Sequence, residues 1–333
     1  MDTYNIYKDI NARTQGEIYI GVVGPVRSGK STFIKHFAEK LILPFMSDGA
    51  GKERAKDELP QSAAGRTVMT TEPKFIPREA CVITPAQDIS MKIRLIDCVG
   101  FMIDGATGVV EDGKERLVKT PWYDYEIPFS EAAEFGTRKV IKDHSTVGIV
   151  MTTDGSIGEL PRDSYKAAEA ATIEELKKIG KPFVVVVNSK NPAAKSATEC
   201  VDEIKKAYGA EAVSLDCEQL TLDDVNRTLE LLLNSFPING IEFYFDRWIE
   251  TLPDDNEIKQ AMVECAGQIL DRITYIKDFN KDSIKVENKY IEDVRSEPVD
   301  MADGIIRLSF KVDENLYYDM LSSIAGEKID NEY

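Results

Sequence analysis

The segment Gly24-Pro25-Val26-Arg27-Ser28-Gly29-Lys30-Ser31 matches the pattern G-x-x-x-x-G-K-[ST]. Its glycines let the loop curl so that successive backbone N–H groups point at an anion, and the following helix adds its positive N-terminal end. Lys30 can then reach the β- and γ-phosphates of a nucleoside triphosphate, while the Ser31 hydroxyl ligates magnesium. We therefore predict that this loop, together with Thr32, binds a nucleotide and Mg2+.

The pattern D-x-x-G occurs at Asp97-Cys98-Val99-Gly100, directly after the segment 91–96, which is predicted to be a strand. An aspartate in this place can hold the magnesium through water, and Gly100 can offer its backbone N–H to the γ-phosphate. The pattern is common on its own and is as often structural. Its position after a strand, in a chain with a phosphate loop, favours the nucleotide role. Asp97 is thus predicted to be both catalytic and a metal ligand.

Two threonines precede this pattern, in the segment Val68-Met69-Thr70-Thr71-Glu72-Pro73. Switch-type NTPases place a threonine ahead of D-x-x-G, where it senses magnesium and the γ-phosphate. We predict that Thr70 and Thr71 act with Lys30 and Asp97 in catalysis, and that Thr71 ligates the metal. The alternative is that these loop threonines only cap turns.

The segment that corresponds to the guanine-reading N-K-x-D of GTPases is Asn188-Ser189-Lys190-Asn191. Asn188 is predicted to bind the nucleotide. In GTPases the final aspartate accepts two hydrogen bonds from guanine, whereas Asn191 presents an N–H donor group where guanine also presents donors. This difference favours ATP over GTP.

Phe101 stands directly after D-x-x-G, where many switch GTPases carry a glutamine or a histidine that orients the attacking water. A phenyl ring cannot orient water by hydrogen bonding. We therefore expect hydrolysis to be slow, or to use a group from elsewhere. Arg27 and Arg66 are candidates for stabilising transition-state charge, although loop arginines are more often merely solvated.

The elements that position these motifs alternate between strands and helices. The apolar run 18–23 predicts a buried strand before the phosphate loop, and a helix follows it up to Pro44. Segments 81–84 and 91–96 are predicted to form a hairpin. Further strands are predicted near 146–152, 182–188 and 211–215, and helices near 130–143, 163–179, 196–208 and 222–235. The predicted fold is an α/β P-loop NTPase of the translation-factor-like GTPase type, with a mostly parallel sheet and helices on both faces.

The rhythm changes after Phe236-Pro237. A smaller α+β region is indicated there by strands near 240–246 and 305–312 and by helices near 257–275 and 314–325. We therefore predict a P-loop NTPase domain over residues 1–237 and a smaller α+β domain over residues 238–333. Segments 44–74 and 101–129 are rich in Gly and Pro and are predicted to be irregular.

The composition excludes several classes of protein. With 58 acidic and 41 basic residues the net charge is −17, which repels phosphate backbones and anionic lipid heads, so no nucleic acid is expected as a partner. The chain has no apolar run near the ~20 residues that span a bilayer, and its N-terminus does not have the pattern of a signal peptide. Its five scattered cysteines fit neither a disulfide framework nor a zinc pattern. We expect a soluble, cytoplasmic protein with reduced, mostly buried thiols.

Several distinctive segments accompany the phosphate loop and D-x-x-G. They are Asp57-Glu58-Leu59-Pro60-Gln61-Ser62-Ala63-Ala64-Gly65, Thr70-Thr71-Glu72-Pro73-Lys74-Phe75 and Thr152-Thr153-Asp154-Gly155. This combination resembles the stage IV sporulation protein A family, the coat morphogenetic ATPases of endospore-forming bacteria. The resemblance is densest over residues 6–190 and continues more loosely to the end of the chain.

The resemblance implies an ATPase that polymerises on the forespore surface, in the mother cell, as a base layer for the spore coat. It also implies the nucleotide roles given above for Lys30, Ser31, Asp97, Thr70 and Thr71. The implied partners are further copies of the chain, other coat morphogenetic proteins and, through a C-terminal region, a small amphipathic membrane peptide. Because members of the family are longer, we expect this chain to lack that region and with it the membrane attachment.

Three hypotheses remain open at this point. The first is an ATPase with slow turnover that drives self-assembly. The second is a structural scaffold that holds nucleotide without significant turnover. Phe101 is compatible with this hypothesis, because it cannot orient an attacking water. The third is a GTP-dependent regulatory switch, against which Asn191 and the acidic surface weigh.

Overall fold

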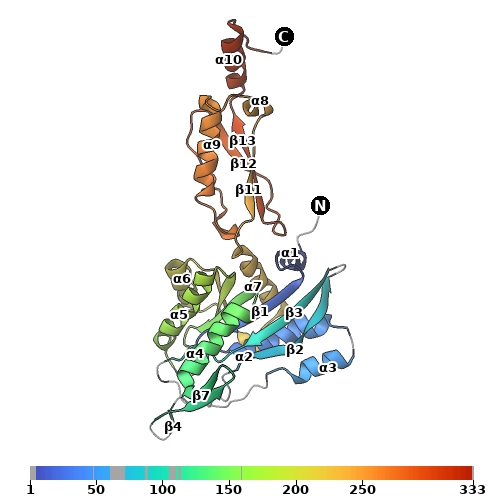
Figure 1. Ribbon diagram of the computed structural model, residues 1–333, viewed down its shortest axis with the longest axis vertical. Coiled ribbons are helices and arrows are strands. Elements are labelled where there is room, and N and C mark those ends of the chain that lie inside the picture. Colours follow the sequence, from blue (N-terminus) through green and yellow to red (C-terminus); the bar gives the residue numbers. More distant parts are fainter. Residues whose placement is uncertain are drawn as a thin grey trace. The chain divides into compact units, whose positions relative to one another are not determined.

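A computed structural model describes residues 5–47, 49–60, 72–86, 89–103, 105, 110–111, 114–158 and 160–331. The chain divides into two compact units, Met1–Ser235 and Phe236–Tyr333 (Figure 1). No helix within the described ranges is long and apolar enough to cross a membrane.

The described residues of the first unit form a six-stranded sheet. Its strands lie in the order β10 (Ala212–Leu215), β9 (Phe183–Asn188), β8 (Val147–Thr153), β1 (Glu17–Val23), β3 (Ile89–Asp97) and β2 (Lys74–Ala86). All neighbours are parallel except β2, which pairs antiparallel with β3. Every residue of β8 and β9 is buried, as expected for central strands covered on both faces. The predicted hairpin and the predicted mostly parallel α/β sheet are confirmed.

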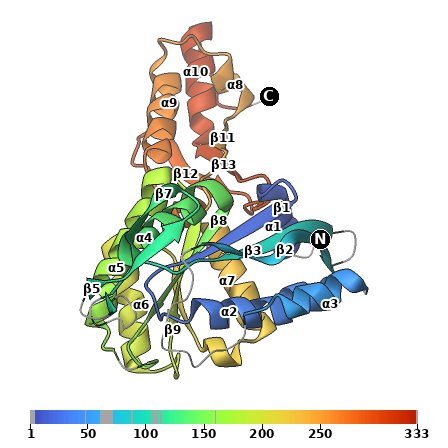
Figure 2. The same cartoon turned by 60° about the horizontal axis from the view of Figure 1, so that its bottom comes forward.

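Helices cover the two faces of this sheet. They are α1 (Ile6–Arg13), α2 (Lys30–Phe37), α3 (Ala50–Asp57), α4 (Phe129–Lys139), α5 (Asp163–Ile179), α6 (Lys195–Tyr208) and α7 (Leu222–Asn234). On one face, α5, α6 and a π-helical turn that extends α4 pack with Val23, Ile96 and Val150. Neighbouring residues of the same strands point to the opposite face, where α2 and α7 contact the sheet (Figure 2).

The ends of two helices show how local sequence sets their bounds. α7 begins at a capping box, in which the Asp224 N–H donates to the Thr221 hydroxyl and the Thr221 N–H donates to the Asp224 carboxylate. The helix predicted to stop before Pro44 instead passes from α2 into a π-helical turn, Ala38–Ile42, and then into a 3-10 turn, Leu43–Phe45. Pro44 is tolerated there because it stands in the first turn of the 3-10 segment.

The segments that were predicted to be irregular contain regular structure. Within 44–74 lies α3, whose mostly polar sequence gives no apolar period and buries only Ala55 among its residues. Within 101–129 lie two short antiparallel pairs, β4 (Val110–Glu111) with β5 (Lys114–Glu115) and β6 (Leu117–Thr120) with β7 (Tyr123–Pro128). These strands are too short and too exposed for period-2 alternation to reveal them.

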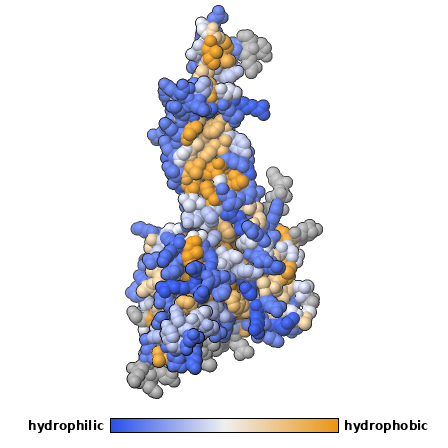
Figure 3. Space-filling model, viewed as in Figure 1, coloured by the Kyte–Doolittle hydropathy of each residue, from blue (hydrophilic) through white to orange (hydrophobic). Residues whose placement is uncertain are grey.

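The second unit is a smaller α+β arrangement. In its described part a three-stranded sheet has the order β11 (Gly240–Tyr244), β13 (Ile305–Val312) and β12 (Ile291–Ser296). Its helices are α8 (Arg247–Glu250), α9 (Glu257–Leu270) and α10 (Glu314–Ala325). Figure 3 shows apolar side chains at the surface of this unit; on α9, Val263 and Leu270 are 65% and 52% exposed. β12 was not predicted, because it buries only Ile291 and its remaining residues are mostly polar.

Candidate functional site

The phosphate loop leaves the carboxyl end of β1 and enters α2 at Lys30. Arg27 and Gly29 have φ angles of +61° and +91°, the kind of alternation that turns successive N–H groups toward one side of a loop. Gly29 also touches β9, because a Cβ at this position would lie 2.2 Å from the Asn188 amide nitrogen. Both the backbone angle and the contact therefore require glycine here.

Lys30 is buried within its own loop and is 5% exposed. Its Nζ donates to the carbonyl oxygen of Pro25 at 2.6 Å and to that of Gly24 at 3.4 Å. Burial lowers the pKa of the Lys30 ammonium, while the nearby Cys98 and Asp97 act in the opposite direction. The cation is thus held at the start of the loop, next to the segment that ends β3.

Ser31 and Asp97 bring the phosphate loop and D-x-x-G together. The Ser31 hydroxyl donates to Oδ2 of Asp97 at 2.7 Å. The other carboxylate oxygen, Oδ1, is buried and has no hydrogen-bond partner in the described part of the chain. Burial raises the pKa of Asp97, against the lowering effects of Ser31 and Lys30. A hydroxyl and a carboxylate with one buried, unpartnered oxygen fit a hard divalent cation such as Mg2+, which prefers oxygen ligands.

The turn at Gly100 lies directly against the phosphate loop. A Cβ at Gly100 would come within 2.1 Å of the Gly24 carbonyl oxygen and 2.6 Å of the Lys30 Nζ, so only glycine fits. The next residue, Phe101, donates its N–H to Gly24 at 3.2 Å and accepts from Val26 at 2.9 Å. Its ring is 4% exposed in the core, which leaves no polar group at this position.

The backbone N–H of Gly100 has a partner that sequence reasoning missed. It donates to the hydroxyl of Thr137 in α4 at 3.2 Å. Thr137 is fully buried, and its own hydroxyl donates to the carbonyl oxygen of Ala133 at 2.8 Å. α4 is thereby tied to the turn of D-x-x-G.

Asn188 lies at the end of β9 and contacts two segments of the protein with its side chain. Its amide nitrogen donates to the carbonyl oxygen of Ser28 at 3.2 Å, and its amide oxygen accepts from the N–H of Cys217 at 3.2 Å. Asn188 was predicted to bind the nucleotide. Its side chain joins the phosphate loop to the segment after β10, and its contact with the nucleotide stays a prediction.

Asp154 organises the loop that was predicted to read the base. It accepts hydrogen bonds from the hydroxyls of Ser156 at 2.6 Å, Ser189 at 2.9 Å and Ser196 at 3.1 Å. Burial raises the pKa of Asp154, but these hydrogen bonds outweigh it and hold the pKa below its usual range. Asn191 lies in the same loop, where its side-chain oxygen accepts from the N–H of Ala193 at 3.3 Å.

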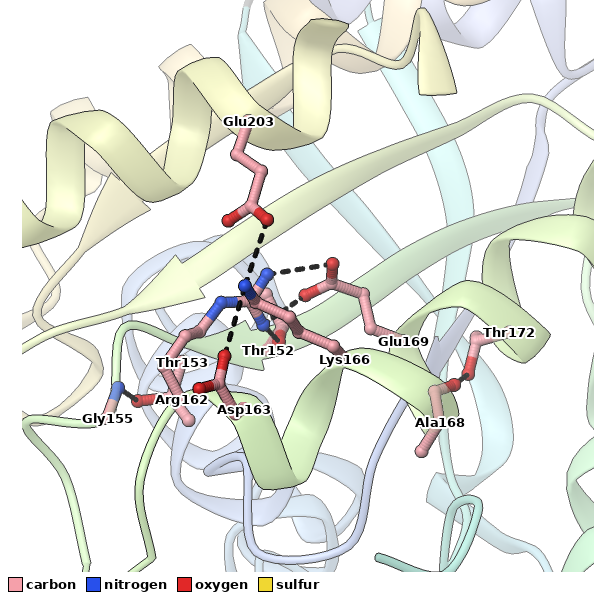
Figure 4. A network of polar contacts seen from close by, with 10 residues as sticks. All are labelled: Thr152, Thr153, Gly155, Arg162, Asp163, Lys166, Ala168, Glu169, Thr172 and Glu203. Carbon is pink, nitrogen blue, oxygen red and sulfur yellow. Dashed lines mark hydrogen bonds and ion pairs between the residues drawn. The ribbon is translucent and has the colours of Figure 1, made fainter. Parts of the chain in front are cut away.

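A largely buried ion pair contacts Thr152, near the end of β8 (Figure 4). Arg162 binds Glu169 through two contacts of 2.6 Å and 2.9 Å, and it donates to the Thr152 hydroxyl at 3.1 Å. The side chains of Arg162 and Glu169 are 15% and 2% exposed. At the edge of this cluster, Lys166 bridges Asp163 and Glu203, both at 3.1 Å.

The remaining predicted site residues fall into two groups. Pro25, Val26 and Ser28 are buried in the phosphate loop, and the Ser28 hydroxyl donates to the Pro25 carbonyl oxygen at 2.9 Å. Thr32 is half-buried in the first turn of α2, and Arg27 is exposed. Thr70, Thr71 and Arg66 lie outside the described residues, so their predicted roles stay predictions.

Comparisons with known proteins agree on one family. Residues 1–237 match the model of the stage IV sporulation protein A ATPase domain, and residues 238–333 match that of its middle domain. The chain is 40% identical over 331 residues to stage IV sporulation protein A of Clostridioides difficile (strain 630) and 39% identical over 330 residues to that of Bacillus subtilis (strain 168). Each alignment covers 99% of this chain and 67% of the relative.

One solved structure is more distantly similar. The crystal structure of the SsGBP and GDP complex aligns with 65% of this chain and 49% of that chain, at 15% sequence identity and a TM-score of 0.37. That value is too low to carry an argument about function.

Proposed function

The chain belongs to the stage IV sporulation protein A family, and on this basis we propose that it is a magnesium-dependent ATPase whose slow turnover is coupled to its own polymerisation. The polymer would form the basement layer of the spore coat around the forespore, in the cytoplasm of the mother cell. Its proposed partners are other copies of the chain, other coat morphogenetic proteins and, through a C-terminal region of the whole protein, a small amphipathic membrane peptide. Nucleic acid is not a proposed partner, because the net charge is −17.

The observation that supports this proposal most directly is the contact between Ser31 and Asp97. It joins the two motifs that a nucleoside triphosphatase needs at one point, and it leaves a buried carboxylate oxygen without a partner in the described residues. Mg2+ held by this pair would offset the negative charge of the β- and γ-phosphates. Lys30 would turn from the carbonyl oxygen of Pro25, 2.6 Å away, to the phosphates of the bound nucleotide.

The loop around Asn191 favours adenine over guanine. The N–H of Ala193 donates to the Asn191 side-chain oxygen at 3.3 Å, so that oxygen is engaged within the protein. The group left to face a base is the side-chain amide NH2, which is a donor. Guanine presents donors at the matching edge, so a donor would face a donor there.

A nucleotide-holding scaffold without significant turnover is the second candidate function. Phe101 favours it, since the ring is 4% exposed and offers nothing that can orient an attacking water. In the enzyme that we propose, this position explains slow hydrolysis, and the proposed sensors Thr70 and Thr71 act from the preceding segment.

The two functions are separated by measuring phosphate release and pelleting of the full chain with ATP, ADP, a non-hydrolysable ATP analogue and no nucleotide. For the ATPase we expect phosphate release, and pellets with ATP that are absent with the analogue. Lys30→Ala should abolish tight binding of a fluorescent ATP analogue, because it removes the cation of the loop. Lys35→Ala, in the last turn of the same helix, is the matched control and should bind normally. Binding without phosphate release by wild type would leave the scaffold as the function.

A further inference from the structure

The Thr137 hydroxyl oxygen accepts the N–H of Gly100, and the Cys98 thiol lies within hydrogen-bonding reach of both groups. The Thr137 hydroxyl has one proton, and that proton is used on the Ala133 carbonyl oxygen at 2.8 Å. The lone pairs of the same oxygen then receive the Gly100 N–H at 3.2 Å. Both groups are buried, so this hydrogen bond is shielded from competing water.

Gly100 lies beside Lys30, the residue expected to reach the β- and γ-phosphates. Gly100 stands three residues after Asp97, which pairs with Ser31. Its backbone is so close to Lys30 that a Cβ at Gly100 would lie 2.6 Å from the Lys30 Nζ. In the proposed ATPase, the Gly100 N–H is the donor that D-x-x-G offers to the γ-phosphate. The same proton therefore has two acceptors, Thr137 in the structure and the γ-phosphate of ATP. ADP has no γ-phosphate and leaves the bond to Thr137 intact.

We propose that Thr137 is a positioning residue that sets the preference between ATP and ADP by competing with the γ-phosphate for the Gly100 N–H. This inference rests on the proposed function and adds to it the residue that discriminates substrate from product. Binding of ATP breaks the Gly100–Thr137 bond, and loss of the γ-phosphate restores it.

α4 links the D-x-x-G turn to the β6–β7 hairpin. Phe135 lies two residues before Thr137, hence about 200° around the helix, so α4 faces the D-x-x-G turn with one side and the hairpin with the other. The rings of Trp122 and Tyr123 pack on Phe135 with centroids 5.1 Å and 5.4 Å away. Trp122 is one of two tryptophans in the chain, so its fluorescence in a Trp248→Phe background reports on this contact.

The decisive variant is Thr137→Val, which keeps the shape of the side chain and removes the acceptor. Without that acceptor, the nucleotide-free and ADP-bound states lose one buried hydrogen bond that the ATP-bound state does not use. We expect affinity for a non-hydrolysable ATP analogue with Mg2+ to rise about two- to tenfold, and affinity for ADP to stay unchanged. Thr137→Ser retains the hydroxyl and should restore the wild-type ratio of the two affinities.

Thr172→Val is the matched control. Thr172 in α5 is also fully buried and makes the same bond to the carbonyl oxygen four residues earlier, Ala168, at 2.7 Å (Figure 4). Its loss should leave the ratio unchanged, because Thr172 does not accept from Gly100. If Thr137→Val does not fold, Thr137→Cys, whose sulfur is a weak acceptor, is expected to shift the ratio in the same direction.

The measurement is titration of the full chain with the analogue and with ADP, read from the fluorescence of Trp122. In wild type the analogue and ADP should give different Trp122 signals, and Thr137→Val should reduce that difference. An unchanged affinity ratio in the folded Thr137 variants, or an equal shift in Thr172→Val, overturns the role of Thr137. Failure of wild type to bind either nucleotide would instead refute the proposed ATPase itself, and the inference would fall with it.

Discussion

Replacing Arg162 by Met should destabilise the first unit strongly, because it leaves a carboxylate buried without its partner. The Glu169 side chain is 2% exposed and is bound by two Arg162 nitrogens, at 2.6 Å and 2.9 Å. Methionine fills a similar volume but supplies no hydrogen-bond donor. The Thr152 hydroxyl also loses the donor that reaches it at 3.1 Å.

The size of the effect follows from the burial of the pair. Removing one partner of a buried ion pair costs about 3–5 kcal/mol. In a unit of this size, Met1–Ser235, each kcal/mol lowers Tm by about 2–4 °C. We therefore expect the transition of the first unit to fall by about 6–20 °C, measured by calorimetry on the nucleotide-free chain.

A second substitution separates the unpaired charge from simple loss of packing. Glu169→Gln in the Arg162→Met background removes the buried charge, so the double variant should be more stable than Arg162→Met alone. Lys195→Met is the control, since its pair with Glu199 has side chains 87% and 66% exposed and should contribute less than about 1 kcal/mol. A fall of less than 2 °C in Arg162→Met, or strict additivity of the two substitutions, would show that the pair does not hold this segment.

Two further changes test the nucleotide site. Because burial raises the pKa of Asp97, the folded state binds its proton more tightly than the unfolded chain. Asp97→Asn should therefore stabilise the nucleotide-free protein at neutral pH by about 1 kcal/mol, and this advantage over wild type should shrink as the pH falls through the folded pKa. The same variant should lose Mg2+-dependent ATP binding. Both effects can be measured by thermal scans from pH 4 to 8 with and without Mg-ATP, and a lower stability of Asp97→Asn without nucleotide would contradict the prediction. Asn191→Asp supplies an acceptor for guanine and should move the GTP-to-ATP affinity ratio about ten- to hundredfold toward GTP in competition binding, and an unchanged ratio would mean that this loop does not read the base.

The strands of the sheet and the helices that cover it could be predicted, because their buried positions are apolar at a regular spacing in the sequence. The run from Phe183 to Val187 is apolar throughout because β9 is buried on both faces, and α5 and α7 match their predicted ranges to within one residue. β12 and α3 each have one fully buried residue, Ile291 and Ala55, and so their sequences show no apolar period.

The candidate site also contains residues that could be predicted from the sequence and residues that could not. The phosphate loop and D-x-x-G are contiguous motifs whose spacing is itself the signal, so Lys30 and Asp97 could be named from the sequence. Thr137 and Arg162 belong to no motif and act only because folding brings them to the turn of Gly100 and to the end of β8. A threonine that bonds the carbonyl four residues earlier is an ordinary feature of helices, as Thr172 shows, and nothing in the sequence sets Thr137 apart.

The groups expected to meet the nucleotide already have partners within the protein, so binding would exchange hydrogen bonds. Lys30 donates to the Pro25 carbonyl oxygen, Ser31 to Asp97, and the Gly100 N–H to Thr137. Only the bond from the Gly100 N–H to Thr137 joins two neutral groups, and its exchange for a bond to a charged phosphate is favourable, because charge-assisted bonds are about twice as strong. Lys30 would contact the β-phosphate, which ADP also supplies, as well as the γ-phosphate, whereas Gly100 would contact only the γ-phosphate. The D-x-x-G turn and its bond to α4 should therefore contribute to discrimination between ATP and ADP, and a variant at Thr137 should change that discrimination while leaving ADP affinity intact.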